Sequence, residues 1–443
     1  MTGVSAADDT AASHPAPDLG EVPGRILVVG AGLAGARTVL ELRRQGFDGW
    51  IGLVGAEPVP PYDRPPLSKH LLDRPAPAWL SDELDADALA AADRVWLGTR
   101  ATGVRVDRDG VRVRIDGPDA AAGAELTADA LVVATGSAPV NPWPAARVLH
   151  TAADAEALRT ALAAARRLVI VGAGWIGAEV ATVAAAAGIE VTVLEALAGP
   201  LPVLGAAGEL TRAWWRAAGV DLRTGVRVAS VDGTGVTLTD GDRVDADLVL
   251  AAVGARPATD WLGGAVARDP DGSIRVDEHL APLAAGDVAA EGPGDLRAAL
   301  SARIRVVGDA ARRRSARHGW VAGGHWDAAL RGPAVAVAGL LGSPAPEDPA
   351  PYVFSTQFGH ELALYGDPGR ADDLVLRGDL AADGGGTALW FEPGTDRLTA
   401  VFTVDRPRDV AAARRLFAGE SLPELDRVAA GDPAVPLRSA LRG

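Results

Sequence analysis

Hydrophobic and polar positions follow the same order in two stretches of this 443-residue chain. In the first stretch, the apolar run 25–29 precedes a glycine-rich turn, residues of helical character and a second apolar run at 50–54. In the second stretch, the run 167–171 precedes the same kind of turn and helix and a run at 190–194. Short β-branched runs on either side of a helix of about three turns predict a right-handed strand–helix–strand unit.

The similarity between the two stretches continues downstream. Alternating apolar and polar positions over 104–115 and 226–244 carry Asp-Gly turn signals, which predict antiparallel hairpins. Each hairpin leads to an apolar strand that ends at a glycine, over 129–136 and 247–254. The chain is therefore predicted to contain an internal duplication of a dinucleotide-binding domain.

The two ends of the chain follow different patterns. A proline-rich stretch over 342–351 precedes residues that alternate as in an antiparallel sheet, for example 387–391, and then a helical stretch over 407–418. We expect a separate α+β domain over 346–443. Residues 1–23 are polar, acidic and rich in Ala and Pro, which predicts a disordered tail.

The two glycine-rich turns carry the residues expected to bind dinucleotides. The first glycine of such a turn permits the tight bend, the second lets the backbone approach a pyrophosphate, and the third lets helix and strand pack closely. The helix N-terminus then offers free N–H groups to the phosphates. An acid at the end of the next strand can bind ribose hydroxyls. These residues are Gly30, Gly32, Gly35 and Glu57 in the first unit and Gly172, Gly174, Gly177 and Glu195 in the second.

The residues after Glu195 indicate which dinucleotide the second unit prefers. A carboxylate at this position repels a 2′-phosphate, and Ala196, Leu197 and Ala198 follow without an arginine. We therefore expect NAD rather than NADP, unless Arg212 or Arg223 folds back to the site.

Composition excludes several classes of function. Because the chain has no cysteine, it cannot ligate an iron–sulfur cluster through thiolates or use a dithiol relay, so redox chemistry must use a bound organic cofactor. The net charge of −15 argues against general nucleic-acid binding. No apolar run is long enough to cross a bilayer, and the N-terminus lacks the features of a secretion signal. We expect a cytoplasmic protein with no nucleic-acid or membrane partner.

Lys69 is the only lysine of the chain, and it ends the segment Pro61-Tyr62-Asp63-Arg64-Pro65-Pro66-Leu67-Ser68-Lys69. This segment resembles the signature of the FAD-dependent NAD(P)H:ferredoxin and rubredoxin reductases that serve oxygenases. The resemblance covers roughly residues 24–360 and includes Ala134-Thr135-Gly136, Val307-Gly308-Asp309-Ala310 and His325-Trp326-Asp327-Ala328-Ala329.

The resemblance implies a fold and two cofactors. The fold class is α/β, with two Rossmann-like dinucleotide-binding domains in a glutathione-reductase-like architecture and a C-terminal α+β domain. FAD is expected in a discontinuous domain formed by 24–144 and 262–341, and NAD(H) in a domain over 145–261.

The resemblance also implies roles for residues around the flavin. In such enzymes the acid that matches Glu57 binds the adenosine ribose of FAD, and the cations that match Arg64 and Lys69 lie along the cofactor. The aspartate that matches Asp309 binds the ribityl chain, and the tryptophan that matches Trp326 lies close to the isoalloxazine. The expected FAD site also includes Ala134, Thr135 and Gly136.

In the second unit, the glutamate that matches Glu179 orients the nicotinamide, and Glu195 takes the NAD ribose. We expect Lys69, Glu179 and Trp326 to act in catalysis. The implied reaction is hydride transfer from nicotinamide C4 to flavin N5, followed by release of single electrons to an acceptor.

Two Gly-Asp-x-Ala segments compete for the ribityl role. Asp309 follows the apolar strand 304–307 and closely precedes His325 and Trp326, whereas Asp287 lies further upstream. We therefore select Asp309 and interpret Asp287 as part of a solvated loop.

A basic cluster follows Asp309 and is expected in a loop near the flavin mouth. Ferredoxins are typically acidic, and a positive patch on an acidic enzyme would steer one to the electron exit. The alternative is a solvated loop in an arginine-rich protein. The cluster consists of Arg312, Arg313, Arg314 and Arg317.

The sequence therefore predicts an NADH:ferredoxin oxidoreductase that contains FAD, with a ferredoxin or similar small iron–sulfur protein as its partner. Two alternatives stay open. An NADH oxidase or quinone reductase shares the cofactor motifs, and a non-turnover flavoprotein similar to the apoptosis-inducing factors shares the fold.

Overall fold

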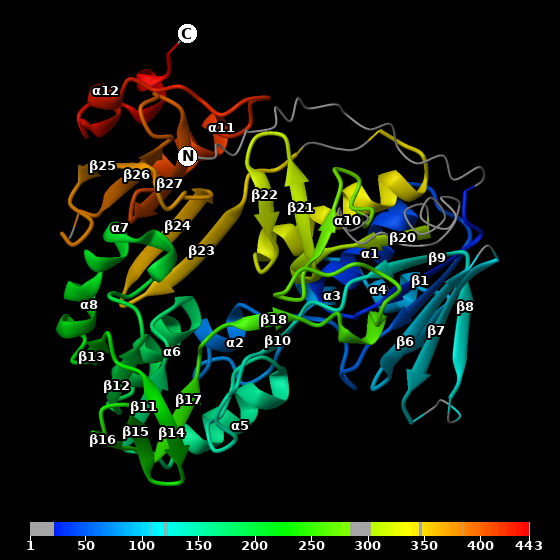
Figure 1. Cartoon of the computed structure of the whole chain (residues 1–443), viewed down its shortest axis with the longest axis horizontal. Helices are drawn as coiled ribbons and strands as arrows, with labels where there is room; N and C mark the ends of the chain where they lie inside the picture. Colours follow the sequence, from blue (N-terminus) through cyan, green and yellow to red (C-terminus); the bar gives the residue numbers. More distant parts are fainter. Residues whose placement is uncertain are drawn as a thin grey trace, which may run out of the picture.

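The computed structural model describes residues 22–442 except 108, 119–120, 122, 284–302, 345–347 and 383. Most of the predicted tail and the rejected Asp287 lie outside the described residues. Figure 1 shows three parts: a first unit in blue, cyan and yellow, a second unit in green, and a C-terminal sheet in orange and red.

A parallel five-stranded sheet forms the first unit, in the order β20-β9-β1-β2-β5. Helices α1 (Leu33–Arg44) and α10 (Trp326–Leu340) pack against each other and share one hydrophobic core with this sheet. Strand β20 follows the second unit in sequence but pairs with β9, so the chain leaves the first sheet, forms the second unit and then adds a last strand to the first sheet. The strands are β1 (Arg25–Val29), β2 (Trp50–Val54), β5 (Arg94–Trp96), β9 (Ala130–Val133) and β20 (Ile304–Val306).

The second unit repeats this plan with a parallel sheet in the order β13-β12-β11-β17 and helix α6 (Trp175–Ala186). Its strands are β11 (Arg167–Val171), β12 (Glu190–Glu195), β13 (Asp221–Thr224) and β17 (Leu248–Ala251). The predicted duplication and the α/β fold class are thus confirmed. The numbered domain boundaries stay a prediction.

Each unit also carries the predicted antiparallel hairpin, extended by a third strand. In the first unit these are β6 (Arg100–Asp107), β7 (Gly110–Asp116) and β8 (Glu125–Ala128). In the second they are β14 (Val228–Asp232), β15 (Gly235–Leu238) and β16 (Arg243–Asp245). The units are joined by an antiparallel pair, β10 (Ser137–Pro139) and β18 (Ala255–Pro257).

Three short elements of the first unit complete its part of the site. Helix α2 (Pro66–Lys69) ends the proline-rich signature, and its contacts with α6 bring the first unit against the second. Strands β21 (Ala311–Ser315) and β22 (Gly319–Ala322) form an antiparallel pair that leads into α10.

The C-terminal part is an antiparallel sheet in the order β23-β24-β27-β26-β25, with helix α11 (Pro407–Leu416) against it. Leu204 and Trp214 of the second unit share a core with Trp390 and Phe402 of this sheet. The strands are β23 (Tyr352–Gln357), β24 (His360–Gly366), β25 (Asp373–Gly378), β26 (Gly386–Phe391) and β27 (Leu398–Val404). The predicted α+β domain is therefore present and lies against the second unit.

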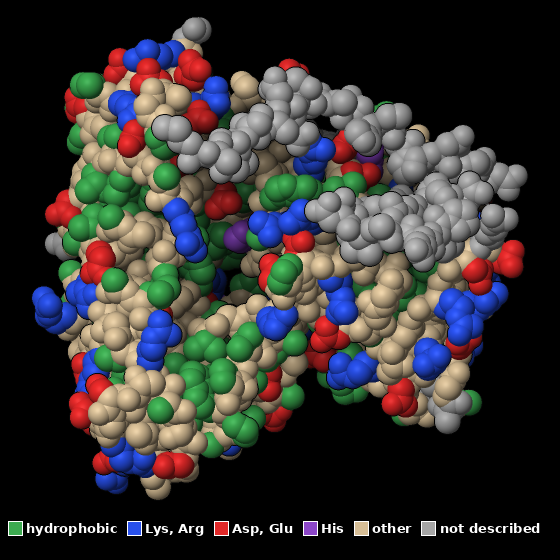
Figure 2. Space-filling view, in the orientation of Figure 1, with side chains coloured by type: hydrophobic (Ala, Val, Ile, Leu, Met, Phe, Trp, Pro, Cys, Tyr) green, Lys and Arg blue, Asp and Glu red, His purple; other side chains and the backbone are tan. Residues whose placement is uncertain are grey.

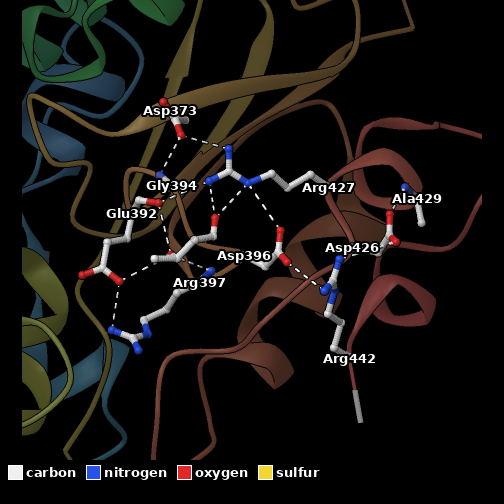
Figure 3. Close-up of polar contacts among 10 residues, drawn as sticks. Asp373, Glu392, Gly394, Asp396, Arg397, Asp426, Arg427, Ala429 and Arg442 are labelled. Atoms are coloured by element: carbon white, nitrogen blue, oxygen red, sulfur yellow. Dashed lines mark hydrogen bonds and ion pairs between the residues drawn. The ribbon is translucent and has the colours of Figure 1, made fainter.

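Ion pairs fasten the last residues to this sheet (Figure 3). Arg427 donates to Asp373 at the start of β25 at 2.9 Å, and Arg442 pairs with Asp396 at 2.9 Å. The end of the chain is thereby held against the loops of its own domain.

Within the described residues, no helix combines the length and apolar character that a bilayer crossing requires.

Candidate functional site

A cavity of about 690 Å³ lies where the two units and the C-terminal sheet meet. The space-filling view shows a hollow between these parts with Lys and Arg side chains near its rim (Figure 2). The volume is that of a site for a sizeable organic ligand. It is lined by the predicted residues Gly30, Gly32, Glu57, Arg64, Lys69, Ala134, Thr135, Gly136, Glu179, Asp309 and Trp326.

The first glycine-rich turn is shaped for a phosphate. A Cβ added at Gly30, where φ is +114°, would lie 2.1 Å from the carbonyl oxygen of Ala134. A Cβ at Gly35 would lie 1.7 Å from the carbonyl oxygen of Gly30, so both positions require close backbone packing. At Gly32, by contrast, no described protein atom lies within 4 Å of such a Cβ. This open space at the N-terminus of α1 fits a pyrophosphate.

The second turn has the same geometry but does not line the central cavity. Gly172 and Gly177 are closely packed, with added Cβ atoms 2.4 Å and 2.1 Å from backbone oxygens, while Gly174 faces open space. The buried carboxylate of Glu195 accepts the backbone N–H groups of Ala173 and Leu197, each at 2.8 Å. Its position beside the turn fits a ribose acceptor.

Of the two arginines that could bind a 2′-phosphate, Arg212 folds back to the segment after Glu195, where it donates to the carbonyl of Ala198 at 3.0 Å. Arg212 pairs with Glu209 at 3.0 Å and Arg223 pairs with Asp221 at 2.7 Å. Support for the predicted preference for NAD therefore comes from the buried carboxylate of Glu195, which would repel a 2′-phosphate.

Glu57 and Arg64 are brought together on the cavity wall. They form an ion pair at 2.9 Å, and the hydroxyl of Tyr62 donates to the second carboxylate oxygen at 2.6 Å. Arg64 also donates to the carbonyl of His150. Burial raises the pKa of Tyr62 above its ordinary value, so this donor keeps its proton. The structure thus orients both predicted FAD contacts.

Asp309 lies in a short 3₁₀ turn that directly precedes β21. Its carboxylate accepts the hydroxyl of Ser137 at 2.7 Å. Thr135 donates to the carbonyl of Ala258 at 2.8 Å, which fixes the segment that precedes Ser137. The segments that carry Thr135 and Asp309 therefore meet at the cavity.

Trp326 is fixed from two sides at the start of α10. Its indole N–H donates to Asp63 at 2.7 Å, and its ring lies edge-on to Phe354 with centroids 5.7 Å apart. Burial raises the pKa of Asp63, an effect that the Trp326 N–H partly offsets. The sequence did not single out Asp63 as the partner of this indole, although it belongs to the quoted signature.

Glu179 is a buried carboxylate, 4% exposed, that all three parts of the molecule contact. It is carried by α6 and forms an ion pair with Lys69 of α2. The hydroxyl of Ser355 on β23 donates at 2.6 Å to the carboxylate oxygen that pairs with Lys69, and the hydroxyl of Ser68, also on α2, donates to the other oxygen. The predicted catalytic residues Lys69 and Glu179 are thus in direct contact. Ser355 was missed because a serine within a strand carries no signal of its own.

The predicted docking cluster is divided by its secondary structure. Arg312, Arg313 and Arg314 lie in strand β21 and not in the expected loop, so alternate side chains point to opposite faces. Arg313 and Arg317 are turned inward, pair with Asp348 and leave Arg317 only 8% exposed. Of the four arginines, Arg312 and Arg314 remain on the outer face.

Family comparison agrees with this geometry. The model of the pyridine nucleotide-disulphide oxidoreductases matches residues 24–302. The chain belongs to this family. A second model, described as reductase C-terminal, matches residues 352–441 of this oxidoreductase.

Relatives of the oxidoreductase cover nearly its whole length. A probable ferredoxin reductase of Castellaniella defragrans is 34% identical and covers 93% of this chain and 97% of its own. The ferredoxin–NAD(+) reductase component of an anthranilate 1,2-dioxygenase system from Burkholderia cepacia is also 34% identical, over 94% and 98%. A crystal structure of the covalent putidaredoxin reductase–putidaredoxin complex superposes with a TM-score of 0.81 at 31% identity, covering 94% of this chain and 98% of that chain.

The two glycines of the first turn should respond differently to alanine. Gly35→Ala should destabilise the fold by about 3 kcal/mol or more, because the new methyl group overlaps backbone. Gly32→Ala should melt within about 2 °C of the wild-type apoprotein, since its backbone already suits alanine, yet bind FAD at least about tenfold more weakly. Thermal melting and FAD titration measure both effects. Undiminished FAD affinity in Gly32→Ala would contradict the pyrophosphate assignment.

His318, beside the inward arginines, should make stability depend on pH. Burial, reinforced by Arg317, lowers its pKa from 6.5 to about 4. The folded protein therefore keeps the ring neutral, while the unfolded chain takes up a proton as the pH falls below about 6.5. The free energy of unfolding should therefore decrease as the pH falls from about 6.5 to about 4.

The free energy of unfolding of the wild type, measured by chemical denaturation, should fall between about pH 7.5 and pH 5. In His318→Gln this fall should be smaller by about 2 kcal/mol. The matched control is His70→Gln, since the side chain of His70 is half exposed. Equal pH dependence in the wild type and both variants would refute the effect.

Proposed function

We propose that the protein is an NADH-oxidising reductase that holds FAD in its first unit and delivers electrons one at a time to a small iron–sulfur ferredoxin serving an oxygenase. The observation that carries the proposal is the meeting of Lys69, Glu179 and Trp326 at one cavity beside the first glycine-rich turn. The family uses FAD and NADH, and the relatives named above are ferredoxin reductases.

When bound, the two cofactors would supply the redox chemistry, with NADH as the hydride donor and FAD as the carrier between two-electron and one-electron transfer. The protein binds and aligns them. The turn at Gly32 and the Glu57–Arg64 pair hold the FAD side of the cavity, and Glu195 beside the second turn takes the NAD ribose. Proximity and orientation of the two bound rings provide most of the rate enhancement.

Two residues are suited to control the reacting region. Lys69 is only 12% exposed and places a cation on the cavity wall, where it favours the electron-rich reduced cofactor. Trp326, held by Asp63, lines both this cavity and a second one of about 1,050 Å³. The indole therefore lies between the cofactor site and the second cavity.

A basic surface beside the cavity suits an acidic partner. Arg312 and Arg314 project from the outer face of β21, next to Arg275 on the neighbouring strand. Asp269 pairs with Arg275 at 3.0 Å and with Arg312 at 3.5 Å, so one carboxylate pairs with two of the three arginines and the surface keeps a positive excess. Such a surface would steer a ferredoxin toward the site, which keeps two of the four predicted docking arginines. The predicted cytoplasmic location fits this use of NADH and stays a proposal.

Anaerobic mixing of the purified flavoprotein with NADH tests the function. The flavin absorbance should bleach at about 10 s⁻¹ or faster, and cytochrome c should then be reduced quickly only when a [2Fe–2S] ferredoxin from the same host is added. Absence of bleaching would favour a non-turnover flavoprotein. Fast oxygen or quinone reduction without ferredoxin would instead identify an oxidase or quinone reductase.

The docking surface is tested by the double variant Arg312→Ser/Arg314→Ser. Its KM for ferredoxin should rise about fivefold at low salt and lose most of its salt dependence, while bleaching by NADH is unchanged. The matched control is Arg100→Ser/Arg105→Ser, which removes two charges from exposed positions of β6. The same rise in both double variants would argue against a local docking surface.

A further inference from the structure

Strand β23 carries two buried polar side chains beside the site. Ser355 is 1% exposed and Gln357 is fully buried. Their neighbours on the strand, Val353 and Phe354, line the central cavity. Since side chains alternate along a strand, Ser355 and Gln357 lie on one face of β23 and Phe354 on the other. The C-terminal sheet thus contributes to the site from two faces of one strand.

Ser355 and Gln357 form a directed chain of hydrogen bonds to Glu179. The side-chain N–H of Gln357 donates to the Ser355 oxygen at 3.0 Å, and the Ser355 hydroxyl donates to Glu179 Oε1 at 2.6 Å. A hydroxyl has one proton, and here that proton is directed to the carboxylate. The carboxylate sets this direction because it only accepts hydrogen bonds, and the Gln357 amide then satisfies the Ser355 oxygen.

The carboxylate receives its other donors from the first unit. Lys69 pairs with the same oxygen as Ser355, and Ser68 donates to the other oxygen. Donors from two sides restrain rotation of the carboxylate about its terminal bond. Glu179 also lines the cavity, so the orientation of its carboxylate is presented directly to a bound ligand.

We propose that Ser355, supported by Gln357, is a positioning residue that holds the Glu179 carboxylate in the orientation used to align the nicotinamide. The C-terminal domain thereby completes the hydride-transfer site, in addition to any part it plays in binding a partner. This inference rests on the proposed function of the cavity. Ser355 does not line the cavity and acts through Glu179.

A neighbouring hydroxyl offers a matched comparison. Thr356 follows Ser355 on β23 but points to the opposite face, where its hydroxyl donates to Glu361 at 3.1 Å within the same hairpin. Thr356→Ala removes a hydroxyl from the same strand without touching Glu179. Any general weakening of β23 should therefore be common to Ser355→Ala and Thr356→Ala.

The test is a double-mutant cycle between Ser355→Ala and Glu179→Gln, read as the rate of flavin bleaching at saturating NADH. Ser355→Ala alone should slow bleaching about tenfold, since the lost bond is to a charged group. In the Glu179→Gln background the same change should matter less than about twofold. Thr356→Ala should bleach within about twofold of the wild type.

Readouts other than activity separate positioning from folding. The FAD content, the melting temperature and the calorimetric affinity of the oxidised protein for NAD⁺ should stay close to wild type in Ser355→Ala, because orientation is lost and not binding. If Ser355→Ala is unstable, Gln357→Met replaces it in the cycle, with the same expectation of coupling to Glu179.

Two results would overturn the proposal: wild-type bleaching by Ser355→Ala, or an equal slowing in both Glu179 backgrounds. Both presuppose a wild-type protein that NADH bleaches. A wild type that NADH does not bleach would instead refute the proposed function, so the two failures are distinguishable.

Discussion

The buried ion pair between Lys69 and Glu179 is the constraint on which the site depends. A carboxylate that is 4% exposed is costly unless it is paired and hydrogen-bonded. Its partners come from α2 of the first unit and β23 of the C-terminal sheet, while the carboxylate itself is carried by α6. The three parts must therefore meet at this point for the charge to be satisfied, and the central cavity lies where they meet.

The C-terminal sheet is consequently part of the site and not an appended module. It shares a hydrophobic core with the second unit, where Trp214 and Phe402 are both buried. That packing sets the position of β23, which supplies Phe354 to Trp326 and Ser355 to Glu179. A rigid apolar contact thus determines the placement of polar groups at the cavity.

Positive charge is concentrated at one place on this acidic protein. The chain carries a net charge of −15, yet two arginines face outward on β21, one strand of the pair that precedes α10. Arg313 and Arg317, from the same run of sequence, instead pair with Asp348 and bind the C-terminal part to the first unit. Adjacent arginines therefore have different surroundings, inward ion pairs or the outer surface, according to the strand face on which each one lies.

The sequence by itself determined the repeated strand–turn–helix units, the antiparallel C-terminal sheet and the glycines of both turns. These features follow from local periodicity and from backbone geometry that only glycine permits, as at positions 30 and 35, so they can be read along the chain. Tertiary structure alone decided which side chains meet. Ser355 and Glu179 are 176 residues apart, and no local pattern encodes a contact over that separation. The division of the arginine cluster likewise depended on Ala311–Ser315 being a strand, because alternate side chains of a strand point to opposite faces.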